Sequence, residues 1–127
     1  MDNIVTGKCV LIVEDEALIR ADAVDMVEDE GFAVCDAPNV AKALRLLETR
    51  DDIGILFTDI DMPGEMDGLD LARVVRKRWP HIAIIIVSGH THLADADVPN
   101  GGVFFSKPYL RATILKALRR ADARSGD

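Results

Sequence analysis

Five short apolar runs, separated by segments with helical periodicity, constrain the fold of this chain most strongly. The first and fourth runs are apolar without interruption. A strand with one covered face alternates apolar and polar residues, whereas a strand covered on both faces is continuously apolar. The runs therefore predict strands buried inside a layered α/β domain. The five predicted strands are Cys9–Val13, Phe32–Cys35, Ile53–Phe57, Ile82–Val87 and Val103–Phe105.

The segments between the runs predict helices. Apolar residues recur at helical spacing from Val40 to Leu47, and Asn39 and Asp67 are residue types that cap helix N-termini. Ile19 and Leu110 are expected on the buried faces of the first and last helices. Between His90 and Gly102 apolar residues are few, and the pattern leaves open whether a further helix forms. The predicted helices are Glu16–Glu30, Val40–Leu47, Asp67–Trp79 and Leu110–Ala121.

Strands that alternate with helices pair in parallel through right-handed crossovers. Five such units predict a doubly wound sheet with helices on both faces. In this architecture the ligand site lies at the carboxyl ends of the strands. The residues that follow each run are therefore the ones to inspect for function.

Composition narrows the class of protein. The chain has 127 residues, 49% of them hydrophobic, so a single domain over 1–127 with a core at about 8–122 and no output domain is expected. The net charge of −7 argues against a generic nucleic-acid binder and against an anionic membrane surface as partner. Cys9 and Cys35 lie in apolar runs and are expected to be buried, reduced thiols. No signal peptide or membrane-spanning run is visible, so a cytoplasmic location is expected.

Polar and charged residues follow four of the five runs. If the fold is as predicted, they converge at one edge of the sheet. They are Glu14 and Asp15, then Asp59 and Asp61, then Ser88 and Gly89, and finally Lys107.

These residue types fit one chemistry. Carboxylates placed together repel one another unless a cation intervenes, and Mg²⁺ prefers oxygen ligands. Glu14, Asp15 and Asp59 therefore predict a Mg²⁺ site. An aspartate can also attack phosphorus, and a lysine and a hydroxyl such as Lys107 and Ser88 can bind the transferred oxygens.

The order of these motifs resembles the receiver domains of two-component signalling, over essentially the whole chain. The resemblance implies a CheY-like (flavodoxin-like) fold with strand order 2-1-3-4-5. It rests on Val13-Glu14-Asp15-Glu16, Asp59-Ile60-Asp61-Met62-Pro63-Gly64, Ser88-Gly89 and Lys107-Pro108.

The resemblance also implies roles for single residues. Asp59 matches the phosphoacceptor, Glu14 and Asp15 match the Mg²⁺ pair, and the backbone carbonyl of Asp61 matches the third protein contact to the metal. Asp61 carries an acid where many relatives have a neutral residue. The remaining matches are Ser88, the hydroxyl switch residue, with Gly89 beside it; Lys107, the phosphate-contacting lysine, with a cis bond to Pro108; and Phe104, the aromatic switch.

The partners that the resemblance implies are proteins. The phosphoryl donor is expected to be a sensor histidine kinase or a histidine phosphotransfer protein. A downstream protein is expected to bind the face that runs from the 82–87 strand to the last helix. Beyond Mg²⁺-dependent self-phosphorylation and self-dephosphorylation, no enzyme activity is expected.

Three alternatives stay open. Asp59-Ile60-Asp61 also fits the nucleophile motif of haloacid-dehalogenase-type phosphatases, but their acidic metal pair follows the lysine, whereas Glu14 and Asp15 precede it here. A pseudo-receiver without phosphorylation is disfavoured by the intact set of acids and Lys107. The chain is compatible both with a free-standing receiver and with one excised from a hybrid kinase.

Overall fold

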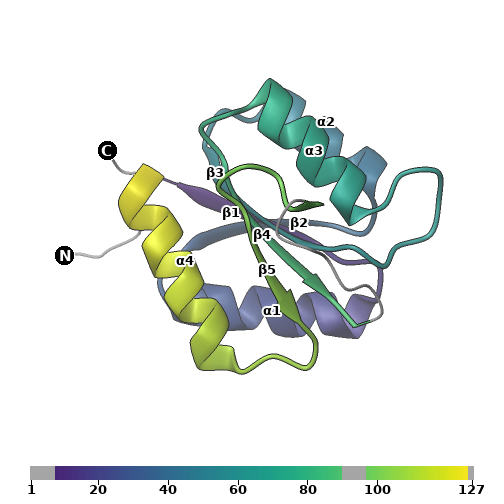
Figure 1. The fold of residues 1–127 in the computed structure, drawn as a ribbon. Helices are drawn as coiled ribbons and strands as arrows, with labels where there is room; N and C mark the ends of the chain where they lie inside the picture. Colours follow the sequence, from purple (N-terminus) through teal and green to yellow (C-terminus); the bar gives the residue numbers. More distant parts are fainter. Residues whose placement is uncertain (1–7, 90–96, 126–127) are drawn as a thin grey trace.

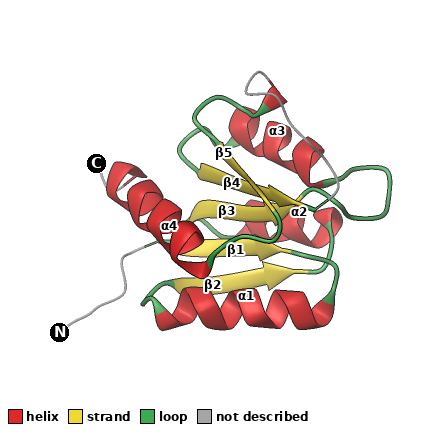
Figure 2. Cartoon of the chain, turned by 60° about the horizontal axis from the view of Figure 1, so that its bottom comes forward, coloured by secondary structure: helices red, strands yellow, loops and turns green. Residues whose placement is uncertain are grey.

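The predicted strands form one parallel sheet. The structure is a computed structural model that describes residues 8–89 and 97–125. The sheet has five strands in the order β2-β1-β3-β4-β5, as expected, and all neighbours pair in parallel (Figures 1 and 2). The elements are β1 Cys9–Val13, α1 Ala17–Asp29, β2 Ala33–Ala37, α2 Val40–Thr49, β3 Ile53–Asp59, α3 Gly68–Arg78, β4 Ala83–Ser88, β5 Val103–Ser106 and α4 Arg111–Ser125.

Helices cover both faces of the sheet. In Figure 1, α1 and α4 lie on one side and α2 and α3 on the other. Each side has its own apolar core, and successive residues of a strand contribute to opposite cores. In β5, Phe104 packs on the α2–α3 side and Phe105 on the α1–α4 side. The continuous apolar runs are thus explained by burial on both faces.

Both predicted helix caps are confirmed. The Asn39 side chain accepts a hydrogen bond from the Lys42 amide at 2.8 Å. Asp67 caps α3, and it forms a reciprocal capping box with Asp70. The second cap matters for function, because it fixes where α3 begins after the β3 carboxyl end.

Some sequence-based boundaries need correction. β2 begins at Ala33, because the Phe32 amide donates to the Val27 carbonyl of α1, at 3.4 Å, although the Phe32 side chain is buried. β3 extends to Asp59. Leu110 is 74% exposed, since it precedes the first turn of α4 and lies outside the buried stripe of that helix. Ile19 is 37% exposed, in the first turn of α1 beside the polar end of the sheet.

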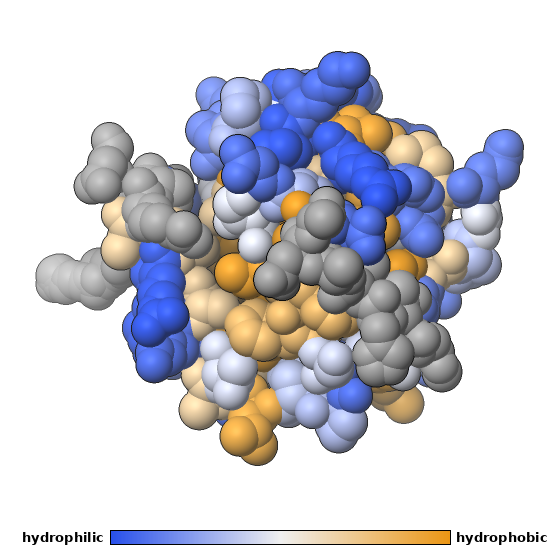
Figure 3. All heavy atoms as spheres, viewed as in Figure 1, coloured by the Kyte–Doolittle hydropathy of each residue, from blue (hydrophilic) through white to orange (hydrophobic). Residues whose placement is uncertain are grey.

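The segment between β4 and β5 is only partly described. His90, His92 and the rest of 90–96 lie outside the described residues, and so does most of the stretch where a further helix was left open. A turn in which the Gly102 amide donates to the Pro99 carbonyl at 2.8 Å leads into β5. β5 is an edge strand, and apolar residues gather over it between the polar surfaces of α3 and α4 (Figure 3).

Two further expectations concern burial and membranes. Cys9 and Cys35 are buried free thiols with their sulfur atoms 3.4 Å apart, as expected. Among the described residues no helix is long and apolar enough to cross a membrane.

Candidate functional site

The polar residues predicted at the strand ends do meet at one edge of the sheet. The strand register places Val13 beside Thr58, Asp59 beside Val87, and Ser88 beside Ser106. Because the strands are parallel, the residues that end them or follow them lie next to one another. The sequence order of the motifs thus becomes a row of functional groups across β1, β3, β4 and β5.

Three carboxylates form an acidic cluster within this row. Glu14, Asp15 and Asp59 each offer an oxygen atom, and these atoms lie within 4.8 Å of one another. Glu14 and Asp59 are 4% and 5% exposed, whereas Asp15 is exposed. A set of oxygen donors that is open on one side fits a hard divalent cation such as Mg²⁺, which keeps part of its water.

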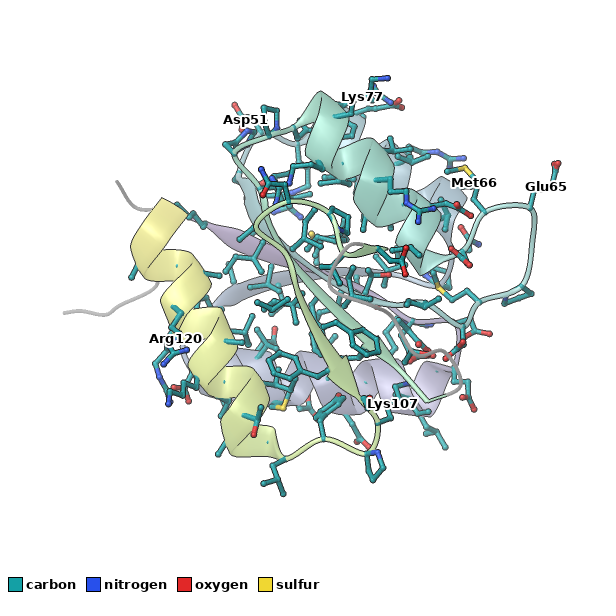
Figure 4. All side chains as sticks on the ribbon, in the orientation of Figure 1. Asp51, Glu65, Met66, Lys77, Lys107 and Arg120 are labelled. Carbon is teal, nitrogen blue, oxygen red and sulfur yellow. The ribbon has the colours of Figure 1, made fainter. Side chains whose placement is uncertain are left out.

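Lys107 neutralises part of this charge. Its Nζ lies 3.1 Å from Asp59 Oδ2 and 3.4 Å from Glu14 Oε1. Figure 4 shows the side chain at the end of β5. Burial lowers the pKa of Lys107, but the hydrogen bond to Asp59 and the charges of Asp59 and Glu14 outweigh burial, so the pKa is raised overall. Lys107 is therefore a fixed cation at neutral pH.

The pKa of Glu14 shows that the carboxylates of the acidic cluster repel one another. Burial raises the pKa of Glu14, and the neighbouring Asp59 charge raises it further. The hydrogen bond from the Glu16 amide to Glu14 Oε2, at 3.0 Å, and the charge of Lys107 oppose this rise but do not cancel it. A second cation at this edge would relieve the repulsion.

Asp59 is held in place through its backbone. The Thr58 hydroxyl donates to the Asp59 carbonyl at 3.0 Å, and the Gly68 amide donates to the Ile60 carbonyl at 3.1 Å. A Cβ on Gly68 would lie 1.8 Å from the Asp59 carbonyl oxygen, so only glycine lets α3 begin this close to β3. The sequence analysis did not single out Gly68; its only signal was a glycine directly after the capping Asp67.

Asp61 takes a position apart from the acidic cluster. Its amide donates to Asp59 Oδ1 at 3.2 Å. Its carboxylate oxygen Oδ2 accepts hydrogen bonds from the Ser88 hydroxyl at 2.6 Å and from the Gly89 amide at 3.2 Å. The structure thus brings the predicted residues Asp61, Ser88 and Gly89 together as a second polar group, beside the first.

Two further predicted features lie near this site. The Lys107–Pro108 bond is cis, as expected. Phe104 is half-buried in β5 beside Ile86, and its side chain packs in the α2–α3 core, outside the polar row.

Besides Gly68, two residues near the site were missed. One is Arg20, which lies on α1. It donates to the Glu14 carbonyl and to the Asp36 carboxylate, both at 2.9 Å. The second, Tyr109, packs its ring against Phe57, and burial raises the pKa of its hydroxyl. Neither residue stands in a motif, so only the folded chain reveals them.

The chain resembles known proteins over most of its length. Residues 10–119 match the sequence profile of the response regulator receiver domain. The chain is 34% identical over 116 residues to the response regulator receiver protein CpdR of Brucella abortus, covering 89% of this chain and 95% of that protein. It is 35% identical over 116 residues to an NtrX-like response regulator of Rickettsia bellii, covering 88% of this chain.

The extent of these matches differs. The chain spans only 24% of the length of the Rickettsia bellii protein and 13% of that of the sensor kinase CckA of Brucella abortus. Among solved structures, a response regulator receiver protein from Sinorhizobium medicae WSM419 superposes with a TM-score of 0.85 at 30% identity, covering 94% of this chain and 97% of that one.

Proposed function

Because the chain belongs to the response regulator receiver domain family, whose members are phosphoacceptors in two-component signalling, we propose that Asp59 accepts the phosphoryl group. One observation carries the assignment. Asp59 is the buried carboxylate that Lys107 contacts at 3.1 Å and that shares the acidic cluster with Glu14 and Asp15. No other described aspartate combines these features.

The acidic cluster supports Mg²⁺ as the cofactor. Glu14, Asp15 and Asp59 would hold the ion, with the Asp61 carbonyl as a further oxygen donor. The bound ion would neutralise charge on the phosphoryl oxygens during transfer. The affinity in the unphosphorylated chain is expected to be modest, because few protein ligands are present and waters complete the shell.

The transfer step follows from the groups around Asp59. A carboxylate oxygen of Asp59 forms a bond to phosphorus while the bond from phosphorus to the donor breaks. With phosphohistidine as donor, the imidazole nitrogen leaves with the electron pair of the P–N bond and is neutral once it carries one proton. Lys107 stabilises the added negative charge from a position that it already occupies. The Ser88 hydroxyl then donates to a phosphoryl oxygen. Phe104 is the aromatic switch residue, whose side chain changes position when Ser88 moves.

The partners follow from the same assignment. A sensor histidine kinase or a histidine phosphotransfer protein supplies the phosphoryl group. A downstream protein binds the face of β4, β5 and α4 in a phosphorylation-dependent way. The chain turns over no substrate beyond its own phosphorylation and dephosphorylation, works in the cytoplasm, and binds neither nucleic acid nor membrane.

The test is labelling by a small phosphodonor. The protein is incubated with acetyl phosphate and Mg²⁺, and the mass of the intact chain is measured over time. The parent should gain one phosphoryl group, and omission of Mg²⁺ should prevent the gain. Asp59→Asn should not label, because the amide is no nucleophile toward phosphorus.

A matched control uses an aspartate far from the site. Asp51→Asn removes the same charge from an exposed residue just before β3, at the opposite end of the sheet (Figure 4). It should label as the parent does. Labelling of Asp59→Asn at the parent rate would show that another residue is the acceptor. Turnover of a generic phosphate ester by the parent would instead favour a phosphatase.

A further inference from the structure

The Asp61 carboxylate is engaged by hydrogen-bond donors rather than by the acidic cluster. The Ser88 hydroxyl and the Gly89 amide both point at Asp61 Oδ2, at 2.6 and 3.2 Å. Two donors that converge on one anionic oxygen form an anion-binding arrangement, in which charge-assisted hydrogen bonds are short and strong. In this chain the anion already present is a side chain of the protein itself.

The same donors lie where an anion on Asp59 would need them. β3 and β4 are neighbours, with Asp59 beside Val87, so Ser88 and Gly89 follow directly at the edge of the site. The Lys107 amide also donates to the Ser88 carbonyl, at 2.8 Å, which fixes the end of β4 against the end of β5. A phosphoryl group on Asp59 would therefore lie near the Ser88 hydroxyl and the Gly89 amide while both are hydrogen-bonded to Asp61.

We propose that Asp61 is an internal competitor of the phosphoryl group: its carboxylate occupies the Ser88 hydroxyl and the Gly89 amide in the unphosphorylated chain and has to release them on phosphorylation. The proposal rests on the proposed function of Asp59. It makes Asp61 a positioning residue for the switch, because it acts through Ser88 and Gly89.

Release of these two donors involves a movement of the Asp61 side chain. The backbone on both sides of Asp61 is anchored. The Asp61 amide donates to the Asp59 carboxylate oxygen Oδ1, the Met62 amide donates to the Ile60 carbonyl at 2.9 Å, and the Met62 side chain is buried. Rotation of the half-buried Asp61 side chain toward solvent would free both donors and leave the loop in place. Binding of these donors by the phosphoryl group has to compensate for the hydrogen bonds that Asp61 loses. Asp61 therefore destabilises the phosphorylated state in which Ser88 and Gly89 contact the phosphoryl group.

Two mechanisms would give such weakening, and they differ in their dependence on Ser88. In competition for donors, the effect of Asp61 passes mainly through the Ser88 hydroxyl, whose hydrogen bond is the shorter of the two. In simple repulsion between two anions, the effect of Asp61 is independent of that hydroxyl. A double-mutant cycle between Asp61 and Ser88 separates them.

The first experiment needs no phosphorylation. Amide hydrogen exchange of the unphosphorylated, metal-free full chain is followed residue by residue by NMR. Asp61→Ala should speed exchange at Gly89, because its amide loses an acceptor, while Glu65→Ala should leave it unchanged. Glu65 is an exposed acid in the same loop, pointing away from the molecule (Figure 4). Unchanged exchange at Gly89 in Asp61→Ala would overturn the contact on which the proposal depends.

The second experiment measures affinity for a phosphoryl mimic. Beryllofluoride is titrated with Mg²⁺ into the parent, Asp61→Ala, Asp61→Asn, Ser88→Ala and the Asp61→Ala/Ser88→Ala double variant. Asp61→Ala should bind about tenfold more tightly than the parent, the ratio expected for relief of one charge-assisted hydrogen bond. Asp61→Asn should gain less, since its amide oxygen still accepts from Ser88. In the Ser88→Ala background the gain should fall below about threefold.

The possible outcomes are distinguishable. An equal gain from Asp61→Ala with and without the Ser88 hydroxyl would mean repulsion and overturn the proposal. Equal affinity of parent and Asp61→Ala, with Glu65→Ala also unchanged, would overturn it while leaving the function of Asp59 intact. If neither the parent nor Glu65→Ala binds beryllofluoride, the proposed function fails and the competitor role fails with it.

Discussion

At the scale of single residues, Lys107 is the cation that lies against both buried carboxylates of the site. Its Nζ lies within 3.4 Å of both Glu14 and Asp59. One lysine cannot balance three acids, however, and Glu14 keeps a raised pKa. The charge of the acidic cluster is therefore only partly balanced by Lys107, and this has a measurable consequence.

We predict that Glu14 makes the stability of the metal-free protein depend on pH. Burial, then the charge of Asp59, raises its pKa above the ordinary 4.5. The folded chain therefore holds the proton of the Glu14 carboxyl more tightly than the unfolded chain does. The stability that this difference contributes is fully present below pH 4.5 and is lost as the pH rises through the folded-state pKa of Glu14. Urea unfolding with chelator present should show a free energy of unfolding that falls over this range and a smaller fall in Glu14→Gln. Glu65→Gln, at an exposed acid, should keep the parent slope, and an identical slope in Glu14→Gln would contradict the prediction.

Gly68 is the residue whose replacement should damage the site most directly. Any Cβ there overlaps the Asp59 carbonyl, so Gly68→Ala has to push α3 away from β3. We expect a loss of about 3 kcal/mol, the upper part of the range for overpacking. Gly89→Ala is the matched control, because its Cβ would make ordinary contacts of 3.7 Å and 3.8 Å with Lys107 and should change stability by less than about 0.5 kcal/mol. Denaturant midpoints measure both, and equal midpoints would show that α3 adjusts without cost.

At the scale of elements, the ends of β1 and β2 are tied to α1 by Arg20. Its side chain is 21% exposed and binds both the Glu14 carbonyl and the Asp36 carboxylate. We predict that Arg20→Lys, which keeps the charge but loses the forked geometry, weakens Mg²⁺ binding by about tenfold, as outer-shell changes do. The free energy of unfolding should change by less than about 1 kcal/mol, because the pair is near the surface.

Arg50→Lys is the control for this prediction. Arg50 also forms a short ion pair, with Asp52 at 2.7 Å, but it follows α2 at the amino end of β3. Metal titration by calorimetry should separate the two variants. If both bind Mg²⁺ as the parent does, Arg20 contributes only to the packing of α1.

The sequence predicted elements better than side-chain directions. Continuous apolar runs and caps such as Asn39 and Asp67 carry strong local signals, so the strands, helices and strand order followed from them and from the resemblance. The end of β2 was missed because exposed Asp36 interrupts its apolar pattern. The hydrogen bonds of Asp61 and the contact at Gly68 depend on how two strands and a helix meet, which no local pattern encodes.

At the scale of the whole molecule, the site exists only when the sheet is complete. Its groups come from the ends of β1, β3, β4 and β5, and the unfolded chain scatters them over more than ninety residues, from Glu14 to Lys107. Anything that binds the assembled groups therefore stabilises the entire domain by mass action. Mg²⁺ should do so, and relief of the repulsion among Glu14, Asp15 and Asp59 is part of the free energy of its binding.

We therefore predict that Mg²⁺ raises the melting temperature of the unphosphorylated chain through the acidic cluster. At ten times its dissociation constant the ion should add about 1.4 kcal/mol, which for a domain of this size is about 5 °C. Glu14→Gln with Asp15→Asn should abolish the shift and, in chelator, melt no lower than the parent, because two repelling charges are gone. Asp51→Asn with Glu65→Gln removes the same charge from exposed positions outside the cluster and should keep the full shift. The measurement is scanning calorimetry at several Mg²⁺ concentrations. A full shift in Glu14→Gln with Asp15→Asn would place the metal elsewhere. A lost shift in Asp51→Asn with Glu65→Gln would mean that overall charge, rather than these ligands, controls binding.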